Sequence, residues 1–223
     1  MNLNGPTLRM TLGLSLGMTL GLAFLACGGD AATTVGAPEP AAVKTPVEPY
    51  VVPPVSTAPL PGESLYHLPT TWTDQAEQTR SIAEFRGHVV VLAMMFTHCD
   101  YACPRIVADM KAIEAGVEAD EALDVRFVLA SYDTKRDTPE TLRAFAKDKE
   151  LNLARWTLLH GKPEGVRELS AAMGGTYAEN DLGNFAHSNQ VVVLDRDGRI
   201  VHVQDGLGIA PDKALAAIEK LRR

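Results

Sequence analysis

Cys99 and Cys103 are separated by three residues in the run from Phe96 to Pro104, directly after an apolar stretch that predicts a buried strand. Where a strand gives way to a helix, two thiols at this spacing can close a disulfide or hold a soft metal ion as a pair of thiolates. A disulfide between residues this close would add little stability, because the gain in chain entropy grows with the length of the closed loop. The pair therefore points to chemistry rather than to structural stabilisation.

The amino terminus predicts export from the cytoplasm. Residues 1–26 contain one charged residue, Arg9, followed by an apolar run from Met10 to Leu25 that is short for a membrane span but suits a signal peptide. Ala26 before Cys27 resembles the lipobox of bacterial lipoproteins, in which the cysteine becomes the lipidated first residue. An ordinary cleaved signal, or an uncleaved anchor that contains a cysteine, is the alternative.

Export decides how the three cysteines of the chain are interpreted. If Cys27 carries lipid, Cys99 and Cys103 remain as one pair in an oxidising compartment. Residues 27–62 are rich in proline and alanine and predict a semi-extended tether. Residues 63–223 suit one globular domain, and the net charge of −7 disfavours nucleic acid as a partner.

The elements that must position the cysteines alternate between strands and helices. His88–Phe96 is continuously apolar, as in a strand buried on both faces. Pro104 suits the first turn of a helix, whose apolar stripe runs from Ile106 to Val117. A second strand is expected at Asp124–Tyr132, and Asp137–Glu140 predicts a helix start with Thr138 as N-cap and a helix running to about Lys149.

The rest of the domain continues this alternation. A short strand at Trp156–His160 is followed by a helix from Pro163 to about Met173. Strands at Gln190–Leu194 and Ile200–Gln204 flank the turn signal Asp195–Gly198, and Pro211 opens a last helix that runs to the C-terminus. A further hairpin is expected between Leu65 and Ile82. This order predicts an α/β, thioredoxin-like fold with a central mixed sheet flanked by helices and an N-terminal β-hairpin extension.

Several motifs occur in the order of one known family. Thr97–Pro104 carries the CxxxCP motif, Asp133 lies four residues before Asp137–Pro139, and His187 shortly precedes Val191–Gly198. In this combination the sequence resembles the Sco/SenC family over essentially the whole folded domain. Members of that family are membrane-tethered, thioredoxin-like copper proteins of the periplasm or the mitochondrial intermembrane space.

The resemblance implies a ligand set and a function. Cys99, Cys103 and His187 would hold copper, as Cu(I) or Cu(II), and the cysteines would also form a redox-active pair able to close a disulfide. The implied protein is a metallochaperone rather than an enzyme, delivering copper to a respiratory oxidase, with subunit II of cytochrome c oxidase as partner. Another respiratory copper enzyme, such as nitrous oxide reductase, stays open as acceptor. A thiol–disulfide oxidoreductase that keeps the acceptor's cysteines reduced is the alternative function, and a redox or copper sensor is weaker.

The chemistry of the residues supports copper independently. Cys99 is expected in the turn that enters a helix, where free N–H groups stabilise a thiolate, and Cys103 can bring its sulfur to the same side. Two thiolates and an imidazole form a soft set of low coordination number that suits Cu(I). Structural zinc usually has four ligands, and the chain offers no fourth cysteine. His187 is expected in the loop that leads into the strand at 190.

Other candidate residues surround this set. Asp133 and His98 are expected to lie beside the ligands, Asp133 as a hydrogen-bonding group or a turn cap and His98 as an auxiliary ligand or a neighbour that tunes thiolate charge. Asp137 is assigned to the helix start only. Met94, Met95 and Met110 are expected to pack in the core rather than to bind copper.

Overall fold

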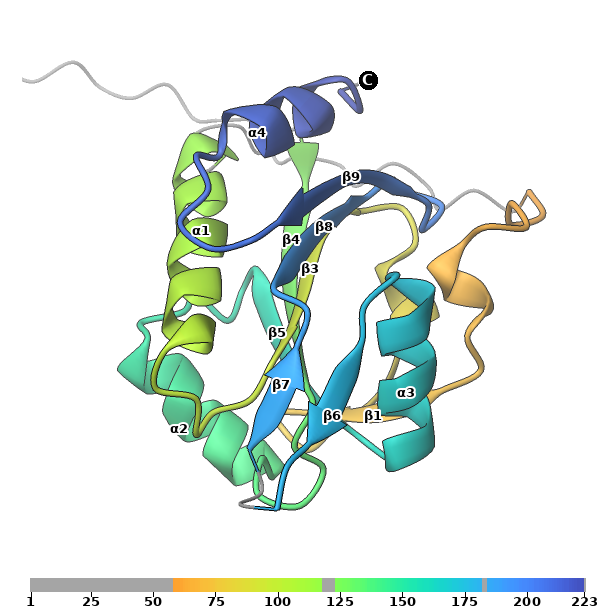
Figure 1. The fold of residues 1–223 in the computed structure, drawn as a ribbon. Coiled ribbons are helices and arrows are strands. Elements are labelled where there is room, and N and C mark those ends of the chain that lie inside the picture. The colour runs from red at the N-terminus through yellow and green to blue at the C-terminus, as the bar shows by residue number, and fades with distance from the viewer. Residues whose placement is uncertain (1–57, 118–122, 182–183, 223) are drawn as a thin grey trace, which may run out of the picture. The chain divides into compact units, whose positions relative to one another are not determined.

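The computed structural model describes residues 58–117, 123–181 and 184–222 (Figure 1). Its core is a seven-stranded mixed sheet in the order β2-β1-β5-β4-β3-β8-β9. The strands of this sheet are β1 (Thr71–Asp74), β2 (Thr79–Ser81), β3 (Val89–Met95), β4 (Val125–Ser131), β5 (Trp156–Gly161), β8 (Gln190–Leu194) and β9 (Ile200–Asp205). A separate two-stranded sheet pairs β6 (Tyr177–Glu179) with β7 (Phe185–His187).

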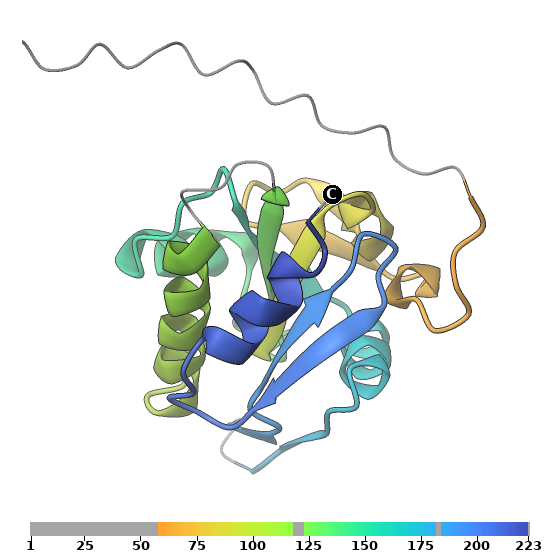
Figure 2. The ribbon, with the colours of Figure 1, turned by 90° about the horizontal axis from the view of Figure 1, so that it is seen from above.

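Helices cover both faces of the large sheet. In the described part of the chain, the four α-helices are α1 (Ala102–Val117), α2 (Pro139–Asp148), α3 (Pro163–Ala172) and α4 (Asp212–Glu219), and two short 3-10 helices are η1 (Leu65–His67) and η2 (Ile82–Phe85). Helices α1, α2 and α4 pack on one face, while α3, η1 and η2 pack on the other, as Figures 1 and 2 show from two directions. The arrangement confirms the predicted α/β fold.

Strand β3 is the central strand that leads to the cysteines. All seven of its residues are buried, because it pairs in parallel with β4 on one side and antiparallel with β8 on the other. Its alternating side chains therefore enter two separate cores, with Val91 and Met95 on the face of α1 and Leu92 and Met94 on the face of α3. The methionines are confirmed as core residues.

Local sequence signals account for the start of α2 and for the β8–β9 turn. Thr138 caps α2, since its side chain accepts the N–H of Thr141 and Pro139 occupies the first turn. The turn before β9 depends on Gly198, whose φ is +82° and whose missing Cβ would lie 2.6 Å from the ring of Tyr66. Both features follow the predicted signals.

Three expectations differ from the structure. The final helix ends at Glu219 rather than at the C-terminus. The hairpin expected between Leu65 and Ile82 contains only β1 and β2, because η1 and η2 form its flanks. The region between α3 and β8, expected as a loop, contains the β6–β7 hairpin.

The described residues do not include the proposed signal peptide, Cys27 or most of the expected tether. None of the helices in the described part of the chain has the length and apolar character that a membrane span requires.

Candidate metal centre

The two cysteines occupy the junction between β3 and α1. Cys103 lies in the first turn of α1 and is fully buried, whereas Cys99, in the preceding turn, is partly exposed. The Cys99 Sγ accepts the N–H of Cys103 at 3.3 Å, and the Cys103 Sγ accepts the N–H of Phe96 at 3.4 Å. Both residues are free thiols in the structure. The backbone therefore holds both sulfurs at the start of one helix.

The environment of Cys99 favours its thiolate. Partial burial alone would raise the pKa of Cys99, but the N–H and thiol of Cys103 and the N–H groups of Tyr101 and Ala102 donate to the sulfur, so the pKa is lowered. These N–H groups belong to the N-terminal end of α1, where a negative charge is also stabilised by the helix dipole. Cys99 is therefore the more accessible thiol of the pair and the one whose pKa is lowered.

Cys103 has the opposite environment. Burial raises the pKa of Cys103 strongly, and the negative charges of Cys99 and Asp137 add to this, while the N–H of Phe96 opposes it. Without a bound cation, the Cys103 sulfur therefore keeps its proton. A soft cation that replaces this proton would remove the cost of burying a thiolate.

His187 reaches the cysteines from the other side, at the end of β7. Strand β7 pairs antiparallel with β6, and His187 lies opposite Tyr177. The Nε2 atom of His187 lies 3.9 Å from the Cys103 Sγ. Sequence reasoning placed His187 in a loop leading to β8; the structure corrects this, because the hairpin presents it from a strand.

The tautomer of His187 follows from its second nitrogen. The Nδ1 atom lies 3.0 Å from the carbonyl oxygen of Ser188, which can only accept a hydrogen bond. Nδ1 therefore carries the proton, and the Nε2 lone pair faces the Cys103 sulfur. Histidines that bind metals use this arrangement, in which one nitrogen is fixed by a hydrogen bond and the other is free to ligate.

Aromatic rings hold the imidazole in place. The His187 ring centroid lies 5.0 Å from that of Tyr132 and 5.9 Å from that of Phe96, and Phe185 packs against both of these rings. Tyr177 completes this aromatic cluster at 4.9 Å from Tyr132. Burial, with a smaller contribution from Cys103, raises the pKa of Tyr132 to about 12, so this side chain stays an uncharged phenol.

The three predicted ligands converge. One donor atom each from Cys99, Cys103 and His187 lie within 4.8 Å of one another. Two sulfurs and one imidazole nitrogen, partly enclosed by aromatic rings, form a soft, low-coordinate site that fits copper better than a hard cation. The ligand roles stay a prediction.

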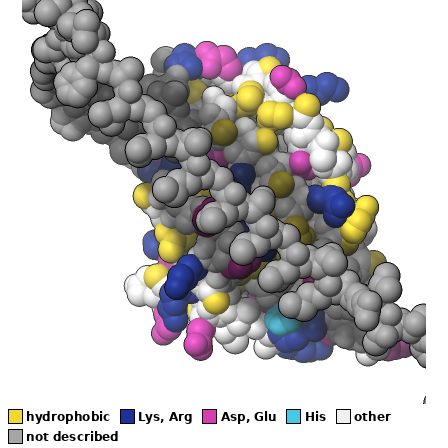
Figure 3. All heavy atoms as spheres, turned by 90° about the vertical axis from the view of Figure 1, so that its left-hand side faces the viewer, with side chains coloured by type: hydrophobic (Ala, Val, Ile, Leu, Met, Phe, Trp, Pro, Cys, Tyr) yellow, Lys and Arg dark blue, Asp and Glu magenta, His cyan; other side chains and the backbone are white. Residues whose placement is uncertain are grey.

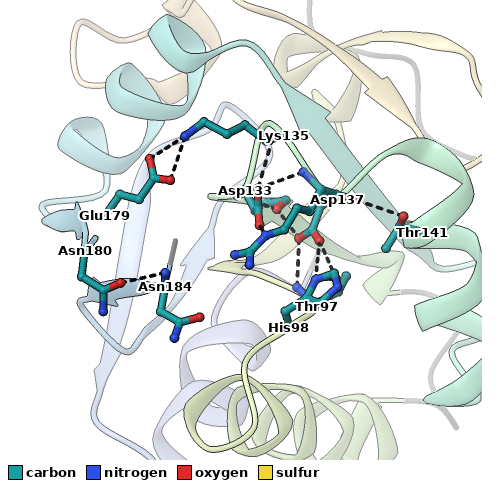
Figure 4. Close-up of polar contacts among 11 residues, drawn as sticks. Thr97, His98, Asp133, Lys135, Asp137, Thr141, Glu179, Asn180 and Asn184 are labelled. Carbon is teal, nitrogen blue, oxygen red and sulfur yellow. Dashed lines mark hydrogen bonds and ion pairs between the residues drawn. The ribbon is translucent and has the colours of Figure 1, made fainter. Parts of the chain in front are cut away.

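The structure gives Asp137, rather than Asp133, the contact with the cysteine motif. Asp133 accepts the N–H groups of Lys135 and Arg136 and pairs with the Arg136 side chain, so it organises its own loop. Asp137, assigned to the helix start only, instead accepts the N–H and the hydroxyl of Thr97, two residues before Cys99. Figure 4 shows this contact beside His98. The assignment of Asp137 to the helix start alone was wrong.

Sequence reasoning missed the β6–β7 hairpin and the aromatic cluster. The hairpin is pinned to the loop after β4 by the ammonium group of Lys135, which lies 2.8 Å and 3.1 Å from the two carboxylate oxygens of Glu179 (Figure 4). Its turn is closed by the Asn180 side chain, which accepts the N–H of Asn184. The available signal was a polar segment between two short runs that each contain an aromatic residue.

The surroundings of the site carry mixed charge. Tyr101, between the cysteines, is 66% exposed and stacks against the guanidinium of Arg105 at 4.0 Å. On the face that carries α1 and α2, the coloured side chains include acidic and basic groups that are intermingled (Figure 3). The visible part of this face does not present a field of one sign.

The chain is similar in sequence to known proteins. The family described as SCO1/SenC matches residues 61–223. The SCO1 protein homolog of Bacillus subtilis is 26% identical over 146 residues, which cover 64% of this chain and 75% of that protein.

Solved structures share the fold. A SCO1/SenC family lipoprotein from Bacillus anthracis superposes with a TM-score of 0.64 at 24% identity, covering 69% of this chain and 92% of that one. Arabidopsis thaliana ScoI with copper bound gives 0.61 at 18% identity, covering 69% and 96%. BsSco, described with a disulfide switch and as a member of the Sco family of cytochrome c oxidase assembly proteins, gives 0.60 at 22%, covering 68% and 90%.

Proposed function

The chain belongs to the SCO1/SenC family, and we propose that it is a membrane-tethered copper metallochaperone for the assembly of a respiratory oxidase. Copper is its cargo, held by the thiolates of Cys99 and Cys103 and by the Nε2 atom of His187. The observation that carries the proposal is the convergence of these three donors within 4.8 Å, with the His187 lone pair facing the sulfur. The copper bound to a structure of the same fold supports it.

Each of the three proposed ligands contributes to copper binding in a different way. Cys99 offers an accessible sulfur of lowered pKa, so it ligates without a large cost of deprotonation. Cys103 loses its proton only when copper takes the proton's place, which encloses the cargo in the core. His187 adds a neutral nitrogen from the hairpin and keeps its Nδ1 proton, which it donates to the carbonyl oxygen of Ser188.

Removal of His187 tests the chaperone function. For His187→Ala we expect Cu(I) affinity, measured by competition with a chromogenic chelator, to fall by more than the roughly 10- to 100-fold that loss of an outer contact costs. Oxidase assembly in cells that carry this variant should fail. If affinity and assembly both survive in His187→Ala, the assignment of His187 as a copper ligand is wrong. The thiol–disulfide function of the pair is then favoured if Cys99→Ser still abolishes assembly.

A thiol–disulfide oxidoreductase is the second candidate function. The pair combines an exposed, nucleophilic Cys99 with a buried Cys103 that can resolve a mixed disulfide, which is the arrangement such exchange uses. The His187→Ala variant separates the two functions, because disulfide exchange does not require the imidazole. If His187→Ala loses copper binding but still reduces a disulfide peptide at the wild-type rate, the cysteines alone carry the exchange activity and copper binding also requires His187.

Location and partner complete the proposal. We infer that lipid on Cys27 anchors the chain to a bacterial membrane, with the domain in the periplasm or outside the cytoplasmic membrane, and that subunit II of cytochrome c oxidase receives the copper. The family lipoprotein from Bacillus anthracis supports the anchor. Mass spectrometry of the mature N-terminus tests it, and an unmodified or uncleaved terminus would refute it.

A further inference from the structure

A cluster of polar residues around Asp137 lies directly beside the cysteine motif. The carboxylate of Asp137 is completely buried at the start of α2. It accepts the N–H of Thr97 at 2.9 Å, the Thr97 hydroxyl at 2.5 Å and the Ser131 hydroxyl at 2.5 Å. One carboxylate therefore joins Thr97, in the turn after β3, and Ser131, at the end of β4, to the start of α2. Thr97 lies two residues before Cys99 (Figure 4).

The hydrogen-bond partners around Thr97 determine which nitrogen of His98 carries the proton. The Thr97 hydroxyl has one proton, which it donates to Asp137, so its oxygen can only accept from the Nδ1 atom of His98 at 3.0 Å. The Nδ1 atom lies 3.7 Å from the Asp137 carboxylate, too far for a direct hydrogen bond. Nδ1 of neutral His98 therefore carries the proton, and Nε2 keeps its lone pair.

The lone pair of His98 is accessible. The His98 side chain is 52% exposed, whereas Cys99 is only partly exposed, Cys103 is buried and His187 lies among the aromatic rings. Metal-binding histidines commonly have this second interaction, in which the opposite N–H is fixed by an oxygen. Asp137 and Thr97 give His98 that arrangement at the outer edge of the cysteine motif.

We propose that the Nε2 atom of His98 is the first ligand on this chain that copper meets, and that Asp137 positions it through Thr97. The proposal rests on the copper function above. A Cu(I) ion leaves a donor of its carrier, forms a bond to the His98 lone pair, and is then taken over by the Cys99 thiolate as the nitrogen bond breaks. The ion stays Cu(I), and His98 neither gains nor loses a proton, since its one proton remains on Nδ1.

Nitrogen NMR of the metal-free protein tests the positioning step without any copper. At about pH 8, above the ordinary pKa of imidazole, the ¹⁵N shifts of His98 should report the Nδ1–H tautomer. Thr97→Val keeps the shape and the N–H of residue 97 but removes the hydroxyl, so it should release His98 to a mixture of tautomers. Wild-type protein in the Nε2–H tautomer would overturn the proposal.

The rate of copper uptake tests the ligand step. Stopped-flow mixing of the full chain with a Cu(I)–bicinchoninate complex should show uptake slowed roughly 10-fold for His98→Ala, with equilibrium affinity within roughly 3-fold of wild type. Thr97→Val should slow uptake in the same direction by less. His67→Ala is the matched control, because His67 is exposed and bonds to Pro61 away from the site, and it should leave the rate unchanged.

The role of Asp137 is tested against Asp133, a buried carboxylate four residues away. Asp137→Asn should release His98 to a mixture of tautomers and slow uptake. Asp133→Asn should change neither, because the Asp133 carboxylate, although it lies within 4.8 Å of a His98 ring nitrogen and of the Asp137 carboxylate, accepts its hydrogen bonds from Lys135 and Arg136 in its own loop. If Asp137→Asn fails to fold, Thr97→Val still decides the question. Wild-type uptake that His98→Ala leaves unchanged refutes this inference alone, whereas a wild type that binds no copper refutes the proposed function.

Discussion

The two sides of the metal centre are built from different kinds of structure. The thiol side lies between β3 and α1, where Phe96 and Cys103 are buried and the backbone leads from the end of the central strand into the helix. The histidine side is a hairpin of two three-residue strands outside that sheet, with Phe185 and His187 only half-buried. Two of the three proposed ligands are thus fixed by the core and one by a small hairpin.

This difference indicates how one site can both hold and release an ion. Ligands fixed by a core keep their geometry whether or not copper is bound, because rearranging them would disturb close packing. A ligand on a short, half-buried hairpin outside the main sheet is expected to move at lower cost. Substitutions on the two sides should therefore differ in their effects on stability and on affinity.

The largest loss of stability is expected on the thiol side, for Phe96→Ala. Phe96 is 3% exposed and packs edge-on against Phe185 and His187. Truncation of a buried phenylalanine costs about 3–5 kcal/mol, to be measured by urea unfolding. A loss below about 1 kcal/mol would contradict the division into a rigid and a mobile side.

A smaller loss is expected for Asp133→Asn, in the loop that connects the two sides. Burial acts to raise the pKa of Asp133, but hydrogen bonds from the Arg136 backbone and side chain and from the Lys135 N–H lower it overall. Since hydrogen bonds to charged groups contribute about 1.5–3 kcal/mol, the variant should lose about 2 kcal/mol at pH 7.

The stability lost in Asp133→Asn should depend on pH. A lowered folded-state pKa means that the Asp133 contribution is fully present above its unfolded pKa and is lost as the pH falls through the folded pKa. The stability gap between wild type and Asp133→Asn should therefore close below about pH 4. A gap that stays constant down to pH 2 would show that the charge is not responsible.

On the histidine side, Phe185→Ala should separate affinity from stability. Phe185 is half-buried, so the loss of apolar contact should cost about 1 kcal/mol. Because its ring also packs against Tyr132 and Phe96, which hold His187, Cu(I) affinity should fall roughly 10-fold. Equal losses for Phe185→Ala and Phe96→Ala in unfolding experiments would remove the distinction between the two sides.

The smallest effect is expected for Lys135→Ala. The ion pair with Glu179 is exposed, and such pairs contribute about 0–1 kcal/mol. Any effect on stability should disappear at about 1 M salt, where charges are screened over a few ångströms. A salt-independent loss above about 2 kcal/mol would mean that the hairpin is held more firmly than its contacts indicate.

The thiol side could be predicted from the sequence, and the histidine side only in part. Strand β3, helix α1 and the Thr138 cap follow from apolar patterns and capping signals that act over a few residues. Strands β6 and β7 are too short and too exposed to leave an apolar pattern. The contact between Asp137 and Thr97 spans 40 positions, and no local signal marks such a pair.

The sulfur of Cys99 also has a structural role, because it accepts backbone N–H groups that a conventional side-chain cap would satisfy. A thiolate fills this role well, whereas a sulfur in a disulfide has lost the negative charge that attracts these groups. The first turn of α1 is therefore coupled to the oxidation of the pair. Amide hydrogen exchange at Ala102 and Cys103 should therefore be faster in the oxidised protein than in the reduced protein.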